Sequence, residues 1–121
     1  RQVEHVDHEE LAKILSETHL FVFASSCENM PNTLIEGMAC GLPIACSAMG
    51  PMPEVLKDGG VYFNPKNPES IAIAIAEIIE NPQLRQRISK RSIALSEKYT
   101  WKNCGDQTWR FLADMAHYDR T

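Results

Sequence analysis

Short apolar runs alternate along the chain with longer segments whose apolar residues recur every three or four positions. The apolar runs lie at residues 20–24 ("LFVFA"), 43–47 ("PIACS") and 60–64 ("GVYFN"). Each run is too short for a helix, so each predicts a β-strand, and the first two read as strands buried on both faces.

The segments between and after these runs predict helices. Each predicted helix follows a residue whose side chain can accept a hydrogen bond from a free N–H of the first turn. These caps are Asp7 (with Glu10 three positions later), Asn32, Asn67, Asn81 and Thr100. Gly41 and Pro43 end the helix predicted from residue 33 to about residue 40. The apolar stripes of the other helices are Leu11, Ile14 and Leu15; Ile71, Ile75, Ile78 and Ile79; Leu84, Ile88 and Leu95; and Trp101, Trp109, Leu112 and Met115.

Strands that alternate with helices predict an α/β fold, a Rossmann-like parallel sheet with helices on both faces. Ligands of such sheets bind beyond the carboxyl ends of the strands. The loop after residues 20–24 is such an end, and it carries Glu28.

Composition narrows the classes of function. The 121 residues suit one small domain, and the net charge of −4 gives no sign of a nucleic-acid binder. No apolar run is long enough to cross a bilayer. The four cysteines form no Cys-x-x-Cys pair, which favours free thiols acting as small apolar residues in a cytoplasmic protein. His5 and His8 lie near Glu4, Asp7 and Glu9 but have no Cys or further His in support, so we expect no metal site.

The stretch "ENMPNTLIE", residues 28–36, holds the candidate chemistry. If Asn32 caps a helix, the free N–H groups of Thr33, Leu34 and Ile35 form a site for phosphate or diphosphate. Glu36, one turn further in, can accept hydrogen bonds from a ribose diol, and Glu28 can reach the opposite end of the ligand. This order of groups fits a nucleotide sugar. The alternative reading is two solvated surface glutamates.

The residues from "FVFASSCENMPNTLIEGMACGLP" onwards resemble the C-terminal domain of the family-4 (group 1) retaining glycosyltransferases, which have the GT-B fold. The mark of that family is a Glu-x7-Glu motif followed by a turn of small residues. Glu28 and Glu36 match the motif, and "MACGLP" matches the turn. The segments "MPEVLKDGG" and "ENPQLRQRISKRSIALSEKYTW" are also similar, so the resemblance spans nearly the whole chain. Ala24 and Gly37 depart from the common family residues.

The resemblance implies roles for particular residues. Glu28 would contact the donor sugar and serve as the catalytic residue, Glu36 would bind the ribose, and amides near Thr33 and Leu34 would hold the diphosphate. The substrate-binding set that we expect is Glu28, Asn29, Met30, Asn32, Thr33, Leu34 and Glu36. The substrate would be a nucleotide-diphosphate sugar, with no cofactor and no metal.

The resemblance also indicates what this chain lacks. Residues 1–121 would form one partial donor domain, without the acceptor-binding N-terminal domain and without the Arg and Lys that the family uses for the diphosphate. The chain itself has no Lys or Arg between Lys13 and Lys57. We therefore expect the isolated chain to bind nucleotide sugars weakly and to be inactive alone.

Three alternatives stay open at the level of sequence. A nucleotide-sugar epimerase of GT-B architecture, or a non-catalytic binding or assembly module, would fit the same pattern. The basic residues of the helix predicted after Asn81 could touch the inner face of a membrane, although a solvated face is the commoner outcome; they are Arg85, Arg87, Lys90 and Arg91. An open sheet edge and an apolar last helix predict self-association of the isolated chain.

Overall fold

The computed structural model describes residues 2–118 and contains one parallel sheet of three strands, in the order β1-β2-β3. The strands are β1 (Phe21–Phe23), β2 (Ile44–Ser47) and β3 (Val61–Phe63). Phe21 pairs with Ile44 in the first ladder, and Ala45 pairs with Val61 in the second. The three predicted strands and their parallel arrangement are confirmed.

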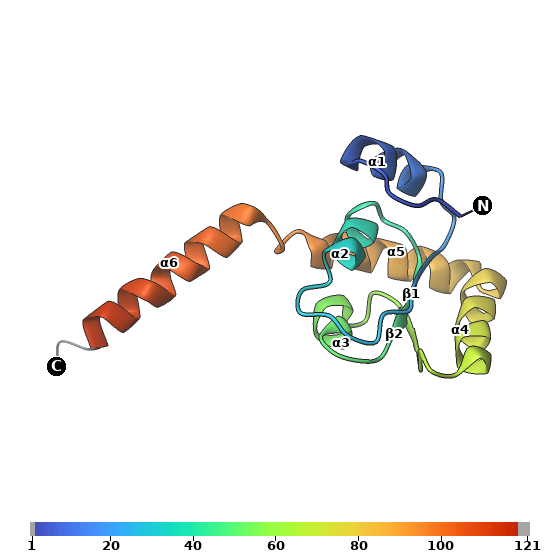
Figure 1. Ribbon diagram of the computed structural model, residues 1–121. Helices are drawn as coiled ribbons and strands as arrows, with labels where there is room; N and C mark the ends of the chain where they lie inside the picture. The colour runs from blue at the N-terminus through green and yellow to red at the C-terminus, as the bar shows by residue number, and fades with distance from the viewer. Residues whose placement is uncertain (1, 119–121) are drawn as a thin grey trace.

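Six helices accompany the sheet within the described residues (Figure 1). They are α1 (His8–Ser16), α2 (Asn32–Ala39), α3 (Met52–Leu56), α4 (Pro68–Glu80), α5 (Pro82–Ser96) and α6 (Trp101–Tyr118). Four of the predicted caps are confirmed by hydrogen bonds from first-turn amides to a side-chain oxygen, at Asp7, Asn67, Asn81 and Thr100. The sequence analysis missed α3, because five residues are too few to show a helical period.

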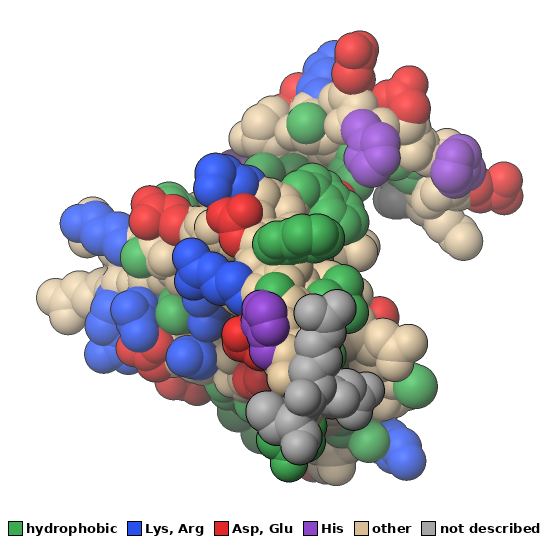
Figure 2. Space-filling model, turned by 90° about the vertical axis from the view of Figure 1, so that its left-hand side faces the viewer, with side chains coloured by type: hydrophobic (Ala, Val, Ile, Leu, Met, Phe, Trp, Pro, Cys, Tyr) green, Lys and Arg blue, Asp and Glu red, His purple; other side chains and the backbone are tan. Residues whose placement is uncertain are grey.

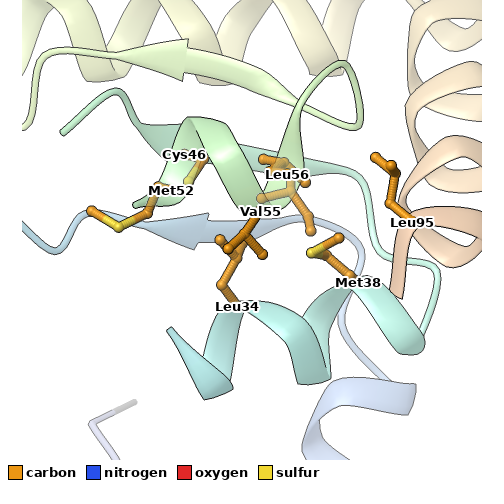
Figure 3. Close-up of a cluster of buried hydrophobic side chains, with 8 residues drawn as sticks. Leu34, Met38, Cys46, Met52, Val55, Leu56 and Leu95 are labelled. Atoms are coloured by element: carbon orange, nitrogen blue, oxygen red, sulfur yellow. The ribbon is translucent and has the colours of Figure 1, made fainter. Parts of the chain in front are cut away.

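The core is divided between the two faces of the sheet, as expected for an α/β fold. Ile44 and Cys46 of β2 point to one face, where they pack with residues of α2, α3 and α5. This cluster comprises Leu34, Met38, Met52, Val55, Leu56 and Leu95 as well (Figure 3). Ala45 points to the other face and packs with Phe63, Ala74, Ile78 and Ile88. Helices therefore cover both faces, and β2 is the buried centre of the sheet.

β1 differs from the prediction of a strand buried on both faces. Val22 is 40% exposed, although its partner Ala45 in the ladder is fully buried. The reason is the position of α4, which packs against β2 and β3 and leaves β1, at the edge of the sheet, uncovered on that face. Ile79, near the end of α4, lies at the border of this uncovered face. It is 57% exposed rather than part of the predicted buried stripe.

Helix α6 extends away from the remainder of the molecule (Figure 1). None of its residues is buried, and Trp101 and Trp109 are 88% and 74% exposed. The expected apolar surface on the last helix is therefore present. No helix within residues 2–118 is both long enough and apolar enough to cross a membrane.

The cysteines are all free thiols, as predicted. Only Cys46 behaves as a small core residue, however. Cys27, Cys40 and Cys104 are exposed, so the expectation that all four act as apolar packing residues is wrong for these three.

Candidate functional site

The carboxyl edge of the sheet is formed by the loops that follow the three strands and by the first turns of α2, α3 and α4. In a parallel sheet these segments meet at one edge, because every crossover helix runs back in the opposite direction. The candidate residues 28–36 lie at this edge, in the loop after β1 and in the first half of α2.

The loop after β1 presents its polar groups to solvent. Ser25 Oγ donates to the carbonyl of Cys27 at 3.3 Å, which holds the turn before Glu28. Glu28 is half-buried, whereas Asn29 and Met30 are exposed. Asn29 and Met30 are therefore accessible to a ligand, as the proposed substrate-binding set requires.

The beginning of α2 corrects one prediction. Asn32 is the first residue of the helix and not its cap; the cap position is Pro31, and no side chain caps this helix. The N–H of Asn32 donates to the carbonyl of Met30 at 2.9 Å, so the turn itself uses this group. Because Pro31 has no N–H and is buried, it can end the loop without leaving a donor unsatisfied.

The free amides of α2 are fewer than the sequence predicted. The N–H of Ile35 donates to the carbonyl of Pro31 at 3.1 Å and is not available to a ligand. Within residues 2–118 no acceptor contacts the N–H groups of Thr33 and Leu34. These two amides, together with the positive end of the helix dipole, are the groups that can bind an anion here.

Packing determines which way α2 faces. Leu34, Gly37 and Met38 form its buried side, so Leu34 can offer a ligand only its backbone amide. Gly37 lies against the ring of Phe21 in β1. Glu36 is half-buried and follows Asn32 by one helical turn, while Thr33 is exposed.

The electrostatics of this edge are acidic. Among the described residues, no hydrogen-bond or ion-pair partner contacts the carboxylate of Glu28 or that of Glu36. Two cations of α5 have partners elsewhere: Arg91 binds Asp58 at 2.6 Å, and Arg85 Nη1 donates to the carbonyl of Ile79 at 2.9 Å.

Chemistry other than that of the two carboxylates is sparse at this edge. No group of three or more His, Cys, Asp or Glu side chains within residues 2–118 is arranged to hold a metal ion. One surface hollow lies between β3 and α4 and another beside Arg85, and neither is lined by residues 24–36. The loop after β2, with Met49 and Gly50, also reaches the carboxyl edge; its place directly after a predicted strand could have marked it as part of the site.

Comparison with known proteins agrees with this architecture. Residues 2–94 match the family "Glycosyl transferases group 1". The O-antigen chain mannosyltransferase B of Escherichia coli is 29% identical over 89% of this chain and 28% of its own length. A sulfoquinovosyl transferase of Arabidopsis thaliana is 25% identical over 78% of this chain and 19% of its own. The structure of a sucrose-phosphate synthase from Thermosynechococcus elongatus superposes with a TM-score of 0.83 and 25% identity, over 96% of this chain and 30% of that chain.

The parallel α/β fold and the match to this family identify the chain as the C-terminal domain of a GT-B glycosyltransferase. The chain belongs to the glycosyl transferases group 1 family. It spans less than a third of the length of the mannosyltransferase and of the sucrose-phosphate synthase.

Proposed function

We propose that this chain is the donor-binding part of a retaining glycosyltransferase, which moves a sugar from a nucleotide-diphosphate sugar to a hydroxyl acceptor. The observation that carries the proposal is that Glu28 and Glu36 flank, along the chain, the free amides of Thr33 and Leu34 at the carboxyl edge, in a chain of this family. The acceptor-binding domain would be a further part of the same polypeptide, and no cofactor or metal is invoked.

Each group has a separate role in this proposal. The two amides of α2 bind a phosphate oxygen of the donor, since they lack acceptors within the described chain and point out of a helix N-terminus. Glu36 accepts hydrogen bonds from the ribose hydroxyls. Glu28 orients the sugar and stabilises positive charge as it develops there when the bond to the diphosphate breaks. Asn29, Met30 and Asn32, all exposed, line the approach to these groups.

The diphosphate needs more positive charge than two amides provide. Residues 14–56 contain no Lys or Arg, so the proposal assigns this neutralisation to groups outside that segment. It follows that the 121-residue chain alone binds nucleotide sugars weakly. Micromolar affinity of the isolated chain in titration calorimetry would contradict the assignment of this neutralisation to groups outside that segment.

The test uses the full-length protein and three variants, Glu28→Gln, Glu36→Gln and Glu80→Gln. Glu80 is an exposed residue at the end of α4, away from the carboxyl edge, and is the matched control. Donor affinity is measured by calorimetry, and the products are separated chromatographically. Glu36→Gln should weaken donor binding by about 1–3 kcal/mol, the usual value of a hydrogen bond to a charged group. Glu28→Gln should slow sugar transfer, and Glu80→Gln should change neither quantity.

The products distinguish the alternatives. Sugar transfer releases a nucleoside diphosphate, and retention is read from the anomeric configuration of the new bond. An epimeric nucleotide sugar in its place would identify an epimerase. Unchanged donor affinity in Glu36→Gln, with no turnover of any donor, would identify a non-catalytic module.

Contact with a membrane is a separate proposal. Of the four basic residues of α5, Arg91 pairs with Asp58, and Arg85 caps the end of α4. Only Arg87 and Lys90 remain without such partners within the described residues, which leaves little free charge for an anionic surface. Flotation with anionic vesicles, compared between the wild type and Arg87→Glu with Lys90→Glu, tests this contact.

A further inference from the structure

Acidic side chains outnumber basic ones at the carboxyl edge of the sheet. At the carboxyl edge, Glu54 and Glu69 occupy the first turns of α3 and α4 and join Glu28 and Glu36. In the described part of the loops and helix starts at that edge, the one cation is Lys66, in the loop after β3. β3 is two strands from β1, a separation of about 10 Å across the sheet.

Four cations of the described residues lie at the opposite, amino edge of the sheet or act on groups there. Lys57 lies between α3 and β3, and Arg91 of α5 pairs with Asp58 in the same connection. Arg87 also acts on the charge of Asp58, and Arg85 lies beside His19 and Leu20, just before β1. In the view of Figure 2 most of the visible Lys and Arg side chains lie on the left-hand side, with Asp and Glu side chains among them. These cations are separated from Glu28 by the length of the strands.

We propose that the site around Glu28 selects donors whose sugar carries no negative charge, a neutral hexose rather than a uronic acid or a sulfonated sugar. This inference rests on the proposed function, which places the sugar against Glu28. A carboxylate on the sugar would face the carboxylate of Glu28 without a neighbouring cation from this chain to offset the repulsion. A neutral sugar instead offers hydroxyl donors, which a half-buried carboxylate accepts favourably.

Family membership does not decide this point. The related proteins include, by name, both a mannosyltransferase and a sulfoquinovosyl transferase. The charge of the accepted sugar therefore has to follow from the residues of each chain. In this chain those residues are the acids at the carboxyl edge and the absence of Lys and Arg from residues 14–56.

The experiment measures the affinity of the full-length protein for four probes, UDP-glucose, UDP-glucuronate, GDP-mannose and GDP-mannuronate. Within the pair whose base is bound, the uronate should bind at least about tenfold more weakly than the neutral sugar, the size expected for one close like-charge contact. Glu28→Gln should reduce that ratio to about threefold or less, mainly by improving the uronate. Glu80→Gln, which changes the same charge at the amino edge, should leave the ratio unchanged.

The outcomes separate the two proposals. Equal binding of the neutral sugar and the uronate, or a ratio that Glu28→Gln leaves unchanged, overturns the charge selection while the donor-binding function stands. If no nucleotide sugar binds, the proposed function fails, and the selection fails with it. A lower affinity for both sugars in Glu28→Gln with the same ratio would assign Glu28 to general donor binding without selection by charge.

Discussion

Gly37 of α2 packs directly on the ring of Phe21 in β1. A Cβ added at Gly37 would lie 2.9 Å from Phe21 Cδ1 and 3.1 Å from Cε1, closer than carbon atoms normally approach. The missing side chain thus sets how near α2 lies to β1. Because Glu36 precedes Gly37 and the free amides lie one turn earlier, this contact also fixes the position of the candidate site.

Gly37→Ala should therefore destabilise the protein. Alanine is better than glycine in a helix by about 1 kcal/mol, but forcing the Phe21 ring aside should cost about 1–3 kcal/mol, as in other overpacked cores. We expect a net loss of about 1 kcal/mol in urea unfolding, together with weaker donor binding.

Gly105 in α6 is the matched control, since a Cβ at that position has no atom within 4 Å. Gly105→Ala should increase helicity in circular dichroism without loss of stability. Restoration of stability when Phe21→Leu is combined with Gly37→Ala would tie the loss to the ring. Equal effects of the two glycine substitutions would show that the contact with Phe21 is unimportant.

Lys57 stores backbone strain at the end of α3. It has a φ of 48° and a ψ of −120°, a conformation that residues with a Cβ adopt at a cost, and its carbonyl accepts a hydrogen bond from Tyr62 Oη at 2.6 Å. Lys57→Gly should relieve this strain and raise the free energy of unfolding by about 0.5–1 kcal/mol.

The comparison for this substitution is Lys90→Gly, in the exposed middle of α5. Glycine there should lower the stability by about 1 kcal/mol, because the conformation is helical and gains nothing from glycine. Chemical denaturation of both variants measures the difference. If Lys57→Gly were as destabilising as Lys90→Gly, the backbone at residue 57 would be unstrained in solution.

The order of elements could be predicted from the sequence, because it depends on local patterns. The caps at Asp7, Asn67, Asn81 and Thr100 were correct because each pairs a short polar side chain with an apolar stripe that follows it. The start of α2 was wrong by one residue. Pro31 occupies the cap position, but its side chain cannot accept a hydrogen bond. A prediction that looks for side-chain acceptors therefore selects Asn32 instead.

Packing between elements was not predictable in the same way. The exposure of Val22 depends on where α4 lies across the sheet, which no periodicity within β1 encodes. The roles of Glu28 and Glu36 came from a motif and from the family resemblance; their places at the carboxyl edge followed from the order of strands. Their contacts with a donor stay a prediction.

Cys46 should be chemically inert in the folded protein. Burial raises the pKa of its thiol from an ordinary value of 9.0 to about 12, whereas Cys27, Cys40 and Cys104 are exposed. At pH 8 a thiol reagent should therefore label three thiols rapidly and the fourth only on unfolding. In Cys46→Ala the native count should stay at three, with no further thiol released by denaturant.

The Cys46 thiol also makes the stability of the protein depend on pH above 9.0. A pKa raised by folding gives a contribution that is complete below pH 9.0 and is lost as the pH rises towards about 12, because the unfolded thiol ionises first. The decline of stability above pH 9.0 should be smaller in Cys46→Ala. Rapid labelling of four thiols in the native protein would show that Cys46 is accessible.

The ion pair between Arg91 and Asp58 predicts a loss of stability at low pH, whereas Cys46 predicts one at high pH. The Arg91 side chain donates to Asp58 Oδ1 at 2.6 Å, and this hydrogen bond is the main reason that the pKa of Asp58 is lowered from 3.8; Arg87 adds a weaker effect of charge alone. A pKa lowered by folding stabilises the protein above the ordinary value of 3.8 and loses that effect as the pH falls below it.

Arg91→Gln should thus lower the melting temperature at pH 6, and the difference from wild type should vanish on acidification. Carboxyl NMR titration should show the pKa of Asp58 returning towards 3.8 in Arg91→Gln and moving little in Arg87→Gln. Equal shifts in the two variants would mean that long-range charge, and not the hydrogen bond, sets the ionisation of Asp58, and the connection between α3 and β3 would then lack this tie to α5.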